Sequence, residues 1–168
     1  VDGAQALGSP VHVFLNPAVY DKLDRTSAQV VMTHEAVHAT TGAALVQRAP
    51  LWLVEGFADY VALRRIALPA SRTSAQIVAQ VKKSGLPSSL PAATDFNTDA
   101  THLGAAYESA WLVCRTLAAK GGERALIKLY DDVLAGTSFA QALRQGFGWS
   151  EADLVSAWRT RLADLAGL

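Results

Sequence analysis

The stretch VVMTHEAVHATTG, residues 30–42, places two histidines four positions apart, with a glutamate directly after the first. Its apolar periodicity and closing glycine predict a helix. Residues four apart in a helix lie on one side, one turn above the other, so His34 and His38 would direct two imidazoles the same way. Glu35 lies about 100° further round the helix. From there its carboxylate could reach a metal-bound water without occupying a ligand position.

This HExxH pattern is typical of a zinc site in which two neutral imidazoles bind the ion and the glutamate takes a proton from water. With the histidine and glutamate content of this chain, the pattern would arise by chance with a probability of roughly 0.002. The alternative is that these are ordinary polar side chains of a helical core. Two imidazoles and a carboxylate would then need other hydrogen-bond partners.

A catalytic zinc ion takes three protein ligands and leaves one position for water. The metzincin continuation requires glycine and histidine at positions that here hold Thr41 and Ala44, so it is excluded. The segment WLVEGFADY supplies Glu55, the sole glutamate between Glu35 and Glu108. It lies on a second predicted helix and is therefore the candidate third ligand.

Asp59 follows Glu55 by one helical turn and shares its side of the predicted helix. An aspartate in this position could accept the spare ring N–H of a ligating histidine and fix its tautomer. We therefore expect Asp59 to orient a ligating histidine through this hydrogen bond.

The combination of HEAVH and WLVEGFADY resembles the gluzincin metallopeptidases, the group that contains thermolysin and the aminopeptidase-like zinc peptidases. The nearest resemblance is to compact bacterial members of the peptidase MA-like group, and it is strongest over residues 30–60. The resemblance implies one zinc ion bound by His34, His38 and Glu55. It also implies Glu35 as general base and Asp59 in contact with a ligand.

The later segment AAYESAW resembles the tyrosine-bearing segment of the aminopeptidase-like members, which implies that Tyr107 lies beside the developing oxyanion. The alternative for Tyr107 is a core tyrosine with a satisfied hydroxyl. His102, at the start of the same predicted helix, is a second candidate for contact with substrate.

Outside this region the pattern is mostly helical. Residues 11–15 alternate as a strand and end at Asn16-Pro17. Thr26 and Gln29 fit a capping box at the start of the first helix, and Ser150 and Asp153 fit one at the start of the last. Further helices are expected at 51–68, 73–85, 102–120, 123–136 and 138–148, with a loop at 86–101.

The fold class predicted is therefore α+β, predominantly α: a single zincin-like domain over residues 1–168. A small strand region would occupy about residues 1–20, the zinc-site helices about 26–68, and a helical C-terminal part about 73–168. The segment HVFLNP resembles the strand that borders the cleft in the family.

Composition excludes several other classes. Fifteen basic and fifteen acidic side chains cancel, and no basic cluster is present, which disfavours nucleic acid as a partner. No apolar run is long enough for a membrane span, so stable membrane insertion within this chain is not expected. The single cysteine, Cys114, lies in an apolar helix and is expected to be buried. The chain begins at Val1, so an upstream segment could be missing.

The function expected is hydrolysis of peptide bonds in a peptide or protein substrate. The strand at 11–15 would pair with the substrate, and the loop at 86–101 would form a wall or lid of the cleft. The resemblance implies a bacterial protein outside the cytoplasm, secreted or membrane-associated. Three alternatives stay open: a zincin-like domain that binds a partner without catalysis, a structural helical domain without zinc, and a zinc hydrolase of non-peptide amides.

Overall fold

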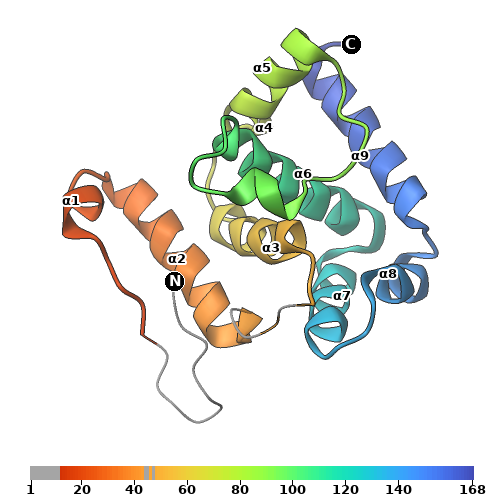
Figure 1. Cartoon of the computed structure of the whole chain (residues 1–168), viewed down its shortest axis with the longest axis horizontal. Helices are drawn as coiled ribbons and strands as arrows, with labels where there is room; N and C mark the ends of the chain where they lie inside the picture. Colours follow the sequence, from red (N-terminus) through yellow and green to blue (C-terminus); the bar gives the residue numbers. More distant parts are fainter. Residues whose placement is uncertain (1–11, 44–45, 47) are drawn as a thin grey trace.

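The computed structural model describes residues 12–43, 46 and 48–168, and all the regular structure within these ranges is helical (Figure 1). The elements, in chain order, are α1 (Pro17–Tyr20), α2 (Arg25–Thr41), α3 (Leu51–Leu63), α4 (Ala70–Thr73), α5 (Ala75–Ser84), the 3-10 helix η2 (Ala93–Phe96), α6 (Leu103–Gly121), α7 (Glu123–Leu134), α8 (Phe139–Phe147) and α9 (Glu151–Ala166).

The predicted α+β class is wrong for this chain, because the described residues contain no strand or sheet. Residues 12–16 of the expected strand are irregular, and Val11 lies outside the described residues. The Asn-Pro pair begins a helix instead of ending a strand. The Asn16 side chain accepts a hydrogen bond from the Ala18 N–H at 3.1 Å, and Pro17 occupies the first helical position. Alternation over so few residues does not hold a strand when no other strand lies among the described residues to pair with it.

Helix α6 forms the centre of the core, and it packs against α3, α5, α7 and α9 (Figure 1). Leu112, Val113 and Cys114 in its middle are fully buried, as predicted for the cysteine. Burying each large apolar side chain of this kind stabilises the fold by about 1.5–3 kcal/mol. The bundle around α6 is therefore the rigid support on which the remaining helices are placed.

Helix α3 lies directly on α6 because Gly56 has no side chain. A Cβ atom added at Gly56 would overlap the backbone carbonyl of Ala110 on α6. The adjacent Glu55 is thereby fixed on a helix that is held against the core.

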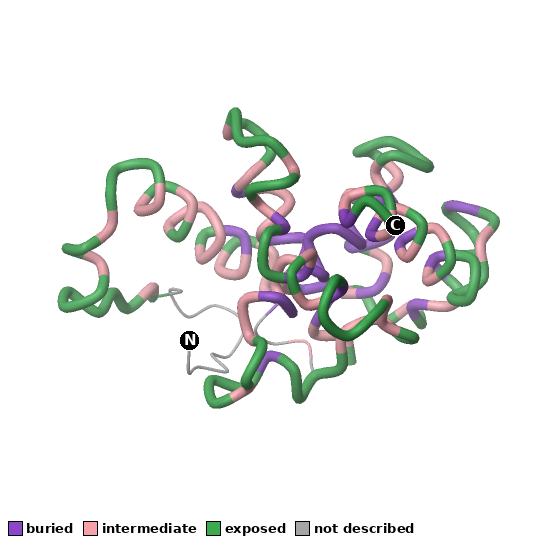
Figure 2. Tube along the Cα trace, turned by 90° about the horizontal axis from the view of Figure 1, so that it is seen from above, coloured by how far each residue is buried: buried purple, intermediate pink, exposed green. Residues whose placement is uncertain are grey.

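Helix α2 is less deeply buried than α3. It packs mainly on α3, and Val37 is its one buried residue among those described. Its first turn and the preceding α1 are largely exposed (Figure 2). The helix begins earlier than predicted: Asp24 is the N-cap and accepts from the Ser27 N–H at 2.7 Å, in place of a Thr26 capping box. Its predicted end is confirmed, because Gly42 adopts a left-handed φ of 68°.

Two further helix boundaries were tested by the structure. The predicted capping box of Ser150 and Asp153 is confirmed, and it starts α9. Helix α3 ends at Leu63, five residues before the predicted Leu68, in a turn where the Ile66 N–H donates to the Leu63 carbonyl.

Within the described part of the chain, no helix has both the length and the apolar character needed to cross a lipid bilayer.

Candidate metal centre

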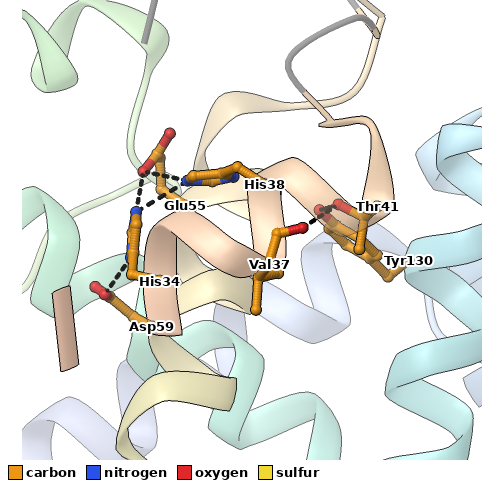
Figure 3. A network of polar contacts seen from close by, with 7 residues as sticks. All are labelled: His34, Val37, His38, Thr41, Glu55, Asp59 and Tyr130. Carbon is orange, nitrogen blue, oxygen red and sulfur yellow. Dashed lines mark hydrogen bonds and ion pairs between the residues drawn. The ribbon is translucent and has the colours of Figure 1, made fainter. Parts of the chain in front are cut away.

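Helices α2 and α3 bring three side chains to one point (Figure 3). His34 and His38 project from the same side of α2, and Glu55 faces them from α3. The two Nε2 atoms are 2.9 Å apart, and Glu55 Oε2 lies 3.1 Å from His34 Nε2 and 3.4 Å from His38 Nε2. The predicted grouping is confirmed, and these three residues could hold a metal ion.

Asp59 lies behind the first of these histidines. Its Oδ1 atom is 2.8 Å from His34 Nδ1, so the ring N–H at Nδ1 donates to the carboxylate. This contact favours the tautomer that leaves Nε2 with a free lone pair, directed toward Glu55. The four side chains of this cluster are only 12–18% exposed, so most solvent is excluded from the ligand atoms.

The convergence of these atoms requires a shared proton or a metal ion between them. Two imidazole lone pairs and a carboxylate oxygen repel one another at such distances unless a proton or a metal ion is shared. Burial lowers the pKa of His34, but the hydrogen bonds and charges of Asp59 and Glu55 outweigh it and raise this pKa to about 10. Burial raises the pKa of Glu55, but the two histidines outweigh it and lower this pKa to about 2. A divalent ion can replace the shared proton at the same place.

Glu35 lies next to this group without joining it. It lines the same cleft as the two histidines and Glu55, but its carboxylate is not one of the three grouped ligands. Its Oε2 atom is buried and has no hydrogen-bond partner in the described structure. This oxygen is therefore not held by any described side chain.

The cleft that contains the group has a volume of about 630 Å³. One wall is apolar and comes from the end of α2 and the start of α3; it includes Ala43, Leu51 and Trp52. Another part of the lining comes from the segment after α5 and from α6. This loop was predicted as a wall, and it contributes Pro91 and Ala93.

Tyr107 on α6 also lines this cleft. Burial, followed by the negative charges of Glu55, Asp59 and Glu35, raises the pKa of Tyr107 to about 12. The hydroxyl therefore keeps its proton at neutral pH and can donate it in a hydrogen bond. Phe96 of η2 packs edge-on against the Tyr107 ring at 5.2 Å and fixes its position.

Other candidate residues lie elsewhere. His102 precedes α6 and lines a different cavity, so the structure does not bring it to the metal-binding group. His12 is exposed, and residues 12–15 form no strand that could pair with a substrate.

Sequence reasoning missed a contact that holds the end of α2. The Thr41 hydroxyl lies 3.3 Å from the hydroxyl of Tyr130 on α7 (Figure 3). Tyr130 stacks on Phe57 with ring centroids 3.9 Å apart. Tyr130 is fully buried. The turn of α2 that follows His38 is thereby tied to the core. Nothing local in the sequence relates Thr41 to a residue 89 positions away.

The contact between Asp59 and His34 predicts the effect of Asp59→Asn. An amide is the same size but carries no charge, and it does not select the Nδ1–H tautomer. Metal affinity should fall by about 10- to 100-fold, as is usual when such a partner is lost. Calorimetric zinc titration of the wild type and the variant measures this, with circular dichroism as a check on folding. Unchanged affinity would show that Asp59 does not orient His34.

No protein-family model, curated protein or solved structure matches this chain. The geometry of the metal-binding group therefore carries the functional argument by itself.

Proposed function

We propose that this protein is a zinc-dependent metallopeptidase of the gluzincin type, which hydrolyses peptide bonds. One observation carries the proposal: the three facing atoms are separated by 2.9, 3.1 and 3.4 Å. Ligands that surround a zinc ion tetrahedrally at about 2.0–2.1 Å are roughly 3.3 Å from one another. The three ligand atoms are thus separated by nearly the distances that zinc requires, without any rearrangement of the side chains.

The donor set favours zinc among the common metal ions. Imidazole suits zinc, whereas calcium and magnesium prefer oxygen ligands alone. His34, His38 and Glu55 would hold the ion, and three protein ligands are the number found in catalytic zinc sites. When bound, zinc supplies a Lewis acid that lowers the pKa of water toward about 7.

Glu35 is the general base in this proposal. Glu35 lines the cleft beside the three grouped ligands without being one of them, so its carboxylate is placed to take a proton from the attacking water. The same carboxylate can then deliver that proton to the leaving amine.

Tyr107 is proposed to donate its hydroxyl hydrogen to the oxyanion that forms on the substrate carbonyl. Its raised pKa keeps it a donor, and Phe96 holds its ring at the edge of the cleft. Tyr107→Phe should lower kcat by about 10²–10³-fold, the usual loss for one such donor, and leave zinc content unchanged. A variant that cleaves as fast as the wild type would remove Tyr107 from the mechanism.

The test of the function is a peptide-library digest by the zinc-loaded protein, read by mass spectrometry. We expect internal or terminal cleavage that stops when a chelator removes the metal and returns when zinc is restored. A protein that holds one zinc ion and leaves the whole library intact would support the partner-binding alternative instead.

A further inference from the structure

The two helices that carry the metal-binding group differ in how firmly they are held. Helix α3, with Glu55, lies against α6 through the close approach at Gly56. Helix α2, with His34 and His38, packs mainly on α3, and Val37 is its one buried residue among those described. A turn of helix with so little burial opens easily unless a further contact holds it. The position of His38 relative to Glu55 therefore depends on what holds the last turn of α2.

Tyr130 of α7 contacts this last turn from the core. Its hydroxyl lies 3.3 Å from the Thr41 hydroxyl, which itself donates to the Val37 carbonyl at 2.7 Å (Figure 3). Because Thr41 has a single hydroxyl hydrogen, the Tyr130 hydroxyl is the donor in the first of these contacts. Burial raises the pKa of Tyr130, so its hydroxyl keeps that hydrogen at neutral pH. Two hydrogen bonds thus run in series from α7 to the carbonyl of the residue before His38.

The ring of Tyr130 contacts the other helix of the metal centre. It stacks on Phe57 of α3, with the ring centroids 3.9 Å apart and the ring planes at 16°. Phe57 follows Glu55 by two residues, and both stacked rings are buried. Side chains in a close-packed core keep one arrangement. Tyr130 therefore touches α2 through its hydroxyl and α3 through its ring, and so relates the position of Thr41 to that of Glu55.

We propose that Tyr130 is a positioning residue of the metal centre. Its hydroxyl holds the turn of α2 that carries His38, and its ring is fixed by Phe57, so that His38 Nε2 stays 3.4 Å from Glu55 Oε2. Tyr130 acts through Thr41 and Phe57 and is not itself one of the grouped ligands. The inference rests on the proposed function only in taking the bound ion to be zinc.

Tyr130→Phe removes the hydroxyl with little change of bulk. Amide hydrogen exchange of residues 38–41 is measured in the full chain before zinc is added, and zinc affinity is then measured by competition with a chromophoric chelator. Without one hydrogen bond, the last turn of α2 should exchange about 3- to 10-fold faster relative to the amides of α6. Zinc affinity should fall by about 3- to 10-fold, because the His38 turn must first be restored. Tyr60→Phe is the matched control, since Tyr60 is a partly buried tyrosine of α3 outside this contact.

Thr41 provides a second pair of variants that break or keep the same hydrogen bond from the side of α2. Thr41→Val should reproduce both effects of Tyr130→Phe, and the double variant should add little, because the two substitutions remove one interaction. Thr41→Ser keeps the hydroxyl and should stay within about twofold of the wild type. Thr40→Val is the matched control: the Thr40 hydroxyl also donates to the carbonyl four residues earlier at 2.7 Å, but Thr40 is exposed.

The outcomes separate positioning from general packing. A merely structural role of Tyr130 would lower the melting temperature and leave the zinc affinity of the folded protein unchanged, and that result would overturn the proposal. Unchanged exchange in the last turn of α2, or equal loss of zinc affinity in Tyr60→Phe, would overturn it as well. A wild type that takes up no zinc would refute the proposed function instead, and hydrogen exchange then decides alone whether Tyr130 holds the His38 turn.

Discussion

Replacing Glu35 with glutamine is expected to abolish most peptide cleavage while zinc stays bound. Glutamine has nearly the same size and shape, but its amide cannot take a proton from water at neutral pH. General base catalysis commonly contributes about 10²–10⁴-fold, so kcat/KM should fall by that amount. The metal should remain because Glu35 is not one of the three grouped ligands.

The measurement pairs metal analysis with the digest of one fluorogenic peptide chosen from the library. Glu151→Gln is the matched control, since Glu151 is exposed in the first turn of α9 and lines none of the described cavities around the site. Equal cleavage by wild type and Glu35→Gln would refute the role of Glu35 as base. Loss of zinc from Glu35→Gln would mean instead that this carboxylate is a ligand.

Removal of Glu55 is expected to have the largest effect on the metal. Glu55→Ala takes away the one ligand from α3 and leaves two imidazoles on a helix that has little other burial. Loss of a residue that hydrogen-bonds to a metal ligand already lowers metal affinity by about 10- to 100-fold. Loss of the ligand itself should therefore lower metal affinity by more than about 100-fold. The dialysed Glu55→Ala variant should therefore contain no zinc and should not cleave peptides.

Calorimetry with zinc measures this loss, and Glu151→Ala serves as the control for removal of an exposed carboxylate. Glu55→Ala that retains stoichiometric zinc at wild-type affinity would show that the third ligand lies elsewhere. Thermal unfolding separates metal loss from collapse of the fold, because α3 remains packed on α6 through Gly56.

The parts of the site that were predictable from the sequence depend on local geometry. The spacing of His34 and His38 fixes their common direction as soon as the helix is recognised, and helix periodicity recurs at every turn. Glu55 and Asp59 are related in the same way on the next helix. Which helices meet is a tertiary property, and here the scarcity of glutamate in the chain made the choice of Glu55 possible.

The parts that could not be predicted depend on contacts between distant segments. Phe96 and Tyr107 meet through packing of η2 on α6, and Thr41 meets Tyr130 across two helices. The incorrect prediction of a strand at residues 11–15 has the same cause. A short apolar alternation becomes a strand only when a partner strand lies beside it, and the capping of α1 by Asn16 was equally consistent with that sequence.

The proposed function depends on His34, His38 and Glu55 holding one divalent ion. Diffraction from zinc-soaked crystals, recorded on both sides of the zinc absorption edge, tests it most directly. We expect a single strong anomalous peak within about 2.2 Å of His34 Nε2, His38 Nε2 and a Glu55 oxygen. A map without a peak between these three side chains, or with the ion bound by other residues, would contradict it.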